Sequence, residues 1–183
     1  MREGILTLAM GAVLVAAAGT ASGAVATAPG TVTRAMAVLL PTDGHSVSGV
    51  VTFTRLDLGV RVVADVSGLT PGPHGIHIHT FGNCSSPASA GGHFSPFRVV
   101  QGTAPHGAPN TLASHIGDLG NVVADASGRA HSDFVANRIL LQGEDSIIGR
   151  SVMVDERADD LRTQPSGNSG PPVACGVIGI VGQ

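Results

Sequence analysis

The segment Gly59-Val-Arg-Val-Val-Ala-Asp-Val66 decides the fold class of this chain. Its apolar side chains recur at every second position from Val60 to Val66, while Arg61 and Asp65 fall on the opposite side. That alternation is typical of a β-strand with one buried face. Segments of strand length recur outward from it, and we predict eight strands, at 34–40, 49–54, 59–66, 75–80, 119–125, 129–135, 147–154 and 176–181.

Turn-forming residues separate these segments, for example at Pro41-Thr-Asp-Gly44 and Asp125-Ala-Ser-Gly128. No segment shows the 3.6-residue periodicity of a long helix, so the sequence predicts an all-β sandwich or barrel. Two stretches do not fit strands: 82–118, rich in His, Gly and Pro, and 155–174, which contains most of the late charges. Long loops on a rigid sheet are common places for function.

The composition excludes several classes of partner. The chain has 183 residues, enough for one domain, with 43% hydrophobic residues, 26 Gly, 11 Pro and no Trp or Tyr. That hydrophobic content is too high for a disordered chain. With a formal net charge of −3 and ten basic residues, all of them Arg, spread along the chain, we expect no nucleic-acid binding and no polybasic membrane contact.

The amino end resembles a secretory signal. An uncharged apolar run follows Met1-Arg2-Glu3, and small residues between 21 and 28 offer cleavage sites. We predict a signal peptide at about 1–26, a domain at 27–183, and a secreted protein with no membrane attachment after cleavage. An uncleaved anchor is the alternative, although the apolar run is short for a span. Outside the cell, Cys84 and Cys175 could form a disulfide.

Histidines dominate the loop at 82–118 and the strand before it. Six of the eight His lie between His74 and His115. In Gly75-Ile-His-Ile-His79, strand alternation places His77 and His79 on one face. The following loop adds His93, His106, His115 and Asp118. Imidazoles with one carboxylate suit tetrahedral Zn²⁺, and imidazole-rich sites also suit copper. The sequence therefore predicts a metal site here.

These motifs together resemble those of the copper/zinc superoxide dismutase family. The resemblance runs from about Ala35 to the carboxyl end and is specific, because several ordered motifs match. The matching segments are Gly75-Ile-His-Ile-His-Thr-Phe-Gly82, Ala90-Gly-Gly-His-Phe-Ser-Pro96, His106-Gly107, His115-Ile-Gly-Asp-Leu-Gly-Asn121, Ile147-Ile-Gly-Arg150, Ala158-Asp-Asp-Leu161 and Ala174-Cys-Gly-Val-Ile-Gly-Ile180.

The resemblance implies an eight-stranded Greek-key β-sandwich or barrel with a long metal-binding loop and a second long charged loop. It also implies a binuclear centre. The implied copper ligands are His77, His79 and His93; the implied zinc ligands are His93, which bridges the two metals, with His106, His115 and Asp118. Asp159 stands where the family has a carboxylate that links histidines of both sites. Cys84 and Cys175 match the family's disulfide.

The same resemblance implies a function and an assembly. The substrate would be superoxide, which copper in the family converts to oxygen and hydrogen peroxide, with His93 as the bridging catalytic residue. Ile148, Gly149 and Ile180 match positions of the dimer contact in the two-fold members, so we expect a homodimer.

The chain departs from the family at two positions. Asp155 stands at the fourth copper-ligand position in place of a histidine, and a carboxylate is a harder ligand than imidazole. Pro172 stands in place of an arginine that meets superoxide; Arg157 or Arg162 in the same loop could compensate. We therefore expect a superoxide dismutase with altered or reduced activity. The alternative is a non-catalytic, structural member that binds zinc and binds copper weakly.

Overall fold

The structure is a computed structural model that describes residues 30–95 and 104–181. The predicted signal peptide at 1–26 lies outside the described residues. The strands below all belong to one compact unit, which spans residues 31–183. Within the described residues, no helix has both the length and the apolar character that crossing a membrane requires.

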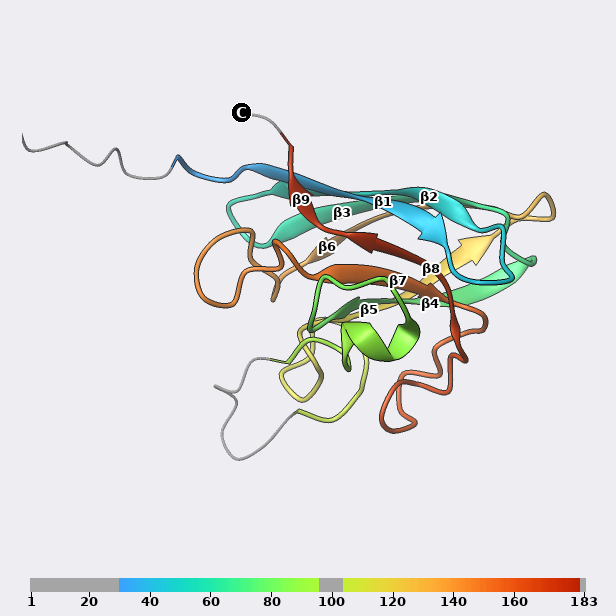
Figure 1. Ribbon diagram of the computed structural model, residues 1–183. Coiled ribbons are helices and arrows are strands. Elements are labelled where there is room, and N and C mark those ends of the chain that lie inside the picture. The colour runs from blue at the N-terminus through green and yellow to red at the C-terminus, as the bar shows by residue number, and fades with distance from the viewer. Residues whose placement is uncertain (1–29, 96–103, 182–183) are drawn as a thin grey trace, which may run out of the picture. The chain divides into compact units, whose positions relative to one another are not determined.

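The described residues of this unit form nine strands and one short 3₁₀ helix, η1 (Pro87–Ala90) (Figure 1). The strands are β1 (Arg34–Pro41), β2 (Ser48–Arg55), β3 (Val60–Ser67), β4 (Gly72–His79), β5 (Asp118–Ala124), β6 (Arg129–Ala136), β7 (Ser151–Asp155), β8 (Pro172–Val177) and β9 (Gly179–Ile180).

Eight of these strands close into an antiparallel barrel. The hydrogen-bonded order is β2-β3-β6-β5-β4-β7-β8-β1-β9, and a further pairing of β1 with β2 completes the ring. The connections β3–β4 and β6–β7 pass over neighbouring strands, as in a Greek key. The predicted all-β, eight-stranded fold is therefore confirmed, with β9 as an additional two-residue strand against β1.

The alternation that predicted the fold is present in β3. Val60, Val62, Ala64 and Val66 are buried in the core, at 0 to 3% exposed. On the outer face, Arg61 forms an ion pair with Asp133 of the neighbouring β6. Buried apolar side chains of β1 to β8 form the main core, and Ala90, Met153 and Cys175 form a second, smaller cluster. This burial is the main source of stability of the barrel.

Several predicted strand boundaries were wrong, and the start of β4 is Gly72 rather than 75. The strand expected at 147–154 begins at Ser151, because residues 147–150 form a turn in which the Arg150 N–H donates to the Ile147 carbonyl oxygen. Ile147 is nonetheless fully buried, so the apolar residues of this turn have the same sequence pattern as a buried strand. The last strand begins at Pro172 rather than 176, and Pro is tolerated at the first position of a strand.

Both long connections are hydrogen-bonded to β4. From the β4–β5 connection, the Phe94 N–H donates to the Ile78 carbonyl oxygen at 2.7 Å. The Gly75 N–H donates to the carbonyl oxygen of Arg157, in the β7–β8 connection, at 2.8 Å. The expected disulfide is confirmed: Cys84 in the first connection is bonded to Cys175 on β8. Backbone hydrogen bonds therefore hold both connections against β4.

Candidate metal centre

The centre begins with the alternation of β4. Ile76 and Ile78 are fully buried in the barrel core, so His77 and His79 point to the other face, beneath the two connections. His77 is also fully buried, and it is paired across the sheet with Asp118 on β5 and Met153 on β7. The rigid sheet therefore holds the first two imidazoles.

His93 lies at the middle of the cluster. Its ring stacks on His77 with centroids 4.0 Å apart, and the ring of His79 is 5.1 Å away. On its other side, His106 and His115 have ring centroids at 5.3 and 5.5 Å. An isolated bridge between His79 and His93 holds the backbone in place. His93 is thus the one imidazole shared by two groups of histidines among the described residues.

One group of histidines surrounds Asp118. The Nδ1 atoms of His93, His106 and His115 lie 2.8, 3.1 and 3.2 Å from the Oδ1 atom of this carboxylate. The ligand atoms of a tetrahedral zinc ion are about 3.3 Å apart, because its bonds to nitrogen and oxygen measure about 2.0 to 2.1 Å. These distances are close to that spacing, and the ligand atoms of His93, His106 and Asp118 lie within 4.8 Å of one another, together with one of His77, so the group suits a metal ion. The Oδ2 atom accepts hydrogen bonds from the N–H groups of Gly107 and His115 and fixes the carboxylate.

Asp159 connects the two groups of histidines. Its Oδ1 lies 2.8 Å from Nε2 of His106, and its Oδ2 lies 2.9 Å from Nε2 of His77. Asn121 fixes this aspartate, because its amide donates to the Asp159 carbonyl oxygen and its Oδ1 accepts from the Asp159 N–H. With both Nε2 atoms engaged in this way, His77 and His106 present their Nδ1 atoms to the centre.

The second group contains His77, His79, His93 and Asp155. The Nδ1 atom of His79 donates to the Gly91 carbonyl oxygen at 2.7 Å, which leaves Nε2 as its ligand atom. Asp155, at the end of β7, places Oδ2 2.9 Å from Nδ1 of His77. The hydroxyl of the buried Ser169 donates to that same Oδ2 at 2.7 Å. Asp155 is therefore in contact with His77, whose ring stacks on that of His93.

Burial and the carboxylates set the charges of the centre. Burial lowers the pKa of His93 to about 4, against the opposing effect of Asp118. For His77, burial acts in the same direction, but the hydrogen bonds to Asp155 and Asp159 outweigh it and raise its pKa to about 9. For Asp118, hydrogen bonds from His115, His93 and Gly107 overcome the effect of burial and hold its pKa far below the usual range. The centre is therefore suited to a bound cation.

A cavity of about 640 Å³ opens beside the histidines. His79, His93 and His115 line it, with Phe81 and Pro165 among the other lining residues. Among the described residues, neither lysine nor arginine lines this cavity. Arg157 lies elsewhere in the β7–β8 connection, where it is about half exposed and pairs with Glu156 at 3.2 Å.

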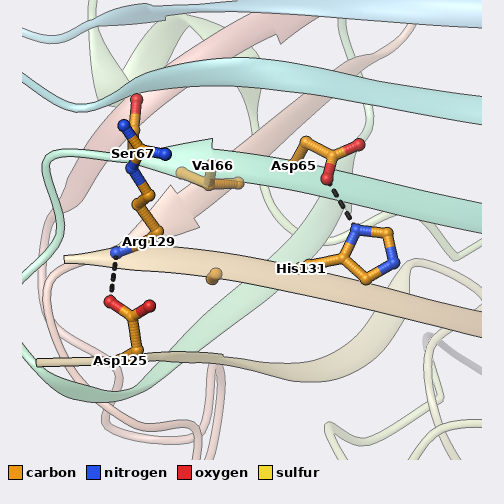
Figure 2. A pocket seen from close by; sticks show the side chains of 7 residues that line it. Asp65, Val66, Ser67, Asp125, Arg129 and His131 are labelled. Carbon is orange, nitrogen blue, oxygen red and sulfur yellow. Dashed lines mark hydrogen bonds and ion pairs between the residues drawn. The ribbon is translucent and has the colours of Figure 1, made fainter. Parts of the chain in front are cut away.

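A second hollow, of about 450 Å³, lies on the outer face of β3 and β6 (Figure 2). His131 and Asp65 point toward each other there, with Nδ1 and Oδ1 2.6 Å apart, and both side chains are about two-thirds exposed. The Arg129 backbone N–H donates to Asp125. Because these groups satisfy one another and are open to solvent, we assign no site to this hollow.

Sequence patterns did not reveal the residues that orient the centre. Ser169 donates a hydrogen bond to Asp155, and Asn121 forms two hydrogen bonds with the backbone of Asp159. Neither serine nor asparagine is a residue type that indicates a metal site. Gly167 is a third example: a Cβ atom there would lie 1.9 Å from Oδ1 of Asp159. Such roles depend on contacts between segments far apart in the chain.

Comparisons with known proteins agree with this geometry. A family model described as copper/zinc superoxide dismutase matches residues 47–178. The chain is 36% identical over 160 residues to a protein of Brugia pahangi named extracellular superoxide dismutase [Cu-Zn], covering 82% of this chain and 78% of that protein. Among solved structures, one titled as the clock protein EA4 superposes with a TM-score of 0.74 at 41% identity, covering 85% of this chain and all of the other.

Proposed function

We propose, from the premise that this chain belongs to the copper/zinc superoxide dismutase family, that it is a secreted superoxide dismutase with reduced activity. The reaction would convert two superoxide ions and two protons to one oxygen molecule and one hydrogen peroxide molecule. The main support is the shared imidazole of His93, which lies between two groups of ligand atoms at the edge of an open cavity.

The proposal assigns the two groups as follows. His93, His106, His115 and Asp118 would hold zinc, and His77, His79 and His93 would hold copper, with Asp155 at the fourth position. Bound copper would supply the one-electron redox chemistry, and bound zinc would fix the shared imidazole.

The chain's own residues would orient the ligands and move protons. Asp118 holds Nδ1 of His93 at 2.8 Å, so the other ring nitrogen, Nε2, is the atom that can bind copper or hold a proton for peroxide. Asp159 fixes His77 and His106 through their Nε2 atoms. These contacts support a centre whose geometry is set before any metal arrives.

Two features support a reduced rate. Asp155 is engaged with His77 and Ser169, and a carboxylate favours oxidised over reduced copper, whereas the reaction requires both states. Pro172 has no charge or side-chain donor with which to attract an anion, and the cavity beside His93 has no cationic lining residue within the described part of the chain.

Restoring the family's residues tests the proposal. The double variant Asp155→His with Pro172→Arg should accelerate superoxide decay by at least about tenfold over the copper- and zinc-loaded parent, because it restores an imidazole and a guiding charge. Decay would be followed by pulse radiolysis at matched copper content, with Asp133→Asn on the outer face of β6 as the control. An unchanged rate in the fully loaded double variant would contradict this interpretation of the two positions.

The Asp155–His77 contact also favours a second candidate function, a non-catalytic zinc-binding member that binds copper weakly. In that case the protein would purify with about one zinc ion per chain and little copper, since the Asp118 group is the better zinc site. Stoichiometric copper together with rapid superoxide decay would eliminate this candidate.

We also propose that the protein forms a homodimer. Val38 on β1, Val177 on β8 and Ile180 on β9 are 53, 46 and 52% exposed. These three strands are neighbours in the sheet, so their outward apolar side chains lie on one side of the barrel. A two-fold contact would bury them.

A further inference from the structure

The two groups of histidines have the same chemical composition. One consists of His93, His106, His115 and Asp118, and the other of His77, His79, His93 and Asp155. Each offers three imidazole nitrogens and one carboxylate oxygen, and each includes His93. Asp155 produces this equality, because it places an oxygen ligand where the resemblance implies a nitrogen ligand.

Each carboxylate also lies close to an imidazole nitrogen. Oδ1 of Asp118 lies 2.8 Å from Nδ1 of His93, and Oδ2 of Asp155 lies 2.9 Å from Nδ1 of His77. Their side chains are 0 and 6% exposed. Both separations are slightly shorter than the spacing of about 3.3 Å between ligands of tetrahedral zinc. Asp155 therefore has one imidazole contact at ligand distance, whereas Asp118 has three.

Two neighbouring residues aim Asp155 at His77. The hydroxyl of Ser169, 1% exposed, donates to Oδ2 at 2.7 Å. Gly75 leaves room for the pair, because a Cβ atom there would lie 2.8 Å from Cε1 of His77 and 3.2 Å from Oδ2 of Asp155. An aspartate in this place is thus part of a packed arrangement with its own supporting contacts.

We propose that the Asp155 half of the centre binds Zn²⁺, so that the chain holds two zinc ions joined by His93. Three imidazoles with one carboxylate form a zinc site, and the carboxylate disfavours the softer Cu⁺ ion. The inference rests on the metal centre of the proposed function but not on dismutase activity.

Zinc titration of the metal-free protein tests the proposal. The purified protein would be stripped with a chelator, titrated with ZnSO₄ in a calorimeter at about pH 7, desalted and analysed for zinc. The parent should bind two zinc ions per chain and Asp155→Asn one, because Asn keeps the shape but lacks the charge of a carboxylate ligand. Ser169→Ala should still bind two, the second about tenfold more weakly. Asp133→Asn serves as the matched control and should equal the parent.

Cobalt provides a second measurement on the same variants. Co²⁺ in a tetrahedral site absorbs strongly in the visible range. The absorbance of the parent should therefore rise in two steps of comparable size as two equivalents of Co²⁺ are added, whereas that of Asp155→Asn should rise only with the first equivalent. Circular dichroism verifies folding, and a variant that keeps its first zinc ion has kept its Asp118 group. If Asp155→Asn fails to fold, the parent's stoichiometry and Ser169→Ala still decide.

A parent that binds only one zinc ion, or an Asp155→Asn variant that binds two as tightly as the parent, would overturn the inference. Either of these outcomes, together with rapid superoxide decay by the copper-loaded protein, would leave the proposed function intact. Two zinc ions in the parent, with no superoxide decay after copper loading, would support the inference and contradict the proposed function.

Discussion

At the scale of single residues, buried aspartates organise the centre. Asp118 and Asp155 each place one oxygen among imidazole nitrogens, while Asp159 fixes two imidazoles from behind. A buried carboxylate is stable only with such partners. The same contacts that satisfy the aspartates therefore orient the histidines. A small displacement of Asp159 should change the orientation of His77 and His106, one in each half of the centre.

Gly167→Ala tests this dependence on Asp159. Gly167 has φ of +71°, and an added Cβ atom would lie 1.9 Å from Oδ1 of Asp159. We expect the backbone strain alone to lower the free energy of unfolding by about 1 to 2 kcal/mol. The displaced carboxylate should weaken zinc binding by about 10- to 100-fold, measured by calorimetry.

Gly143→Ala is the control for this prediction. Gly143 has φ of +96°, and a Cβ atom added there would meet no other atom within 4 Å. This variant should lose stability through backbone strain but bind zinc as the parent does. Equal zinc affinity in the two variants would show that Asp159 does not depend on the space at Gly167.

At the scale of elements, β4 supports the metal centre, and the two long connections are hydrogen-bonded to this strand. Ile76 and Ile78 bind the strand to the core, and His77 and His79 face the connections. The β4–β5 connection has little regular structure apart from η1 within its described residues, so hydrogen bonds, the disulfide and the metal centre must hold it. The Cys84–Cys175 bond attaches this connection to β8.

Removal of the disulfide should therefore be costly. The bond joins residues 91 positions apart, and the loss of so large a closed loop lowers the free energy of unfolding by up to about 4 to 5 kcal/mol in the chain-entropy model. We expect a decrease approaching this value for Cys84→Ser with Cys175→Ser, measured by urea unfolding of metal-free protein. The parent in reducing agent should match the double variant, and a loss below about 1 kcal/mol would contradict the prediction.

At the scale of the whole molecule, a closed barrel leaves few unpaired strand edges, so assembly must use side chains on the barrel surface. The apolar residues Val38, Val177 and Ile180 are gathered on adjacent strands. By contrast, the outer face of β3 and β6 has the Arg61–Asp133 ion pair and the contact between Asp65 and His131, the second of which Figure 2 shows. This contrast is the basis for the expected dimer.

Ile180→Glu should convert the dimer to a monomer, because two carboxylates would face each other across a two-fold contact. Val123→Glu is the control: Val123 is 63% exposed and lies on β5, away from β1, β8 and β9. Sedimentation equilibrium of the two variants and the parent checks this. A parent that sediments as a monomer, or equal dissociation in both variants, would refute the proposed contact.

Much of this could be predicted without coordinates. The alternation in 59–66 indicated a strand with one buried face, and that in Gly75-Ile-His-Ile-His79 placed His77 and His79 on one face, because side chains on a strand alternate regardless of distant contacts. The boundaries at Ser151 and Pro172 could not be predicted in this way. A buried turn such as 147–150 is as apolar as a strand, and only its hydrogen bonds distinguish it.

The sequence by itself determined the barrel class, the cysteine pair and the set of imidazoles and carboxylates available to a metal, since these follow from local periodicity and ordered motifs. Only the tertiary structure decided that Asp155 rests on His77 and Ser169, that Asp159 joins His77 to His106, and that no arginine lines the described part of the cavity. The physical reason is the separation along the chain of the residues that interact. Alternation acts between neighbours in the chain, whereas the contacts of His77 join β4 to Asp155 and Asp159, about 80 positions later, which only the closed barrel brings together.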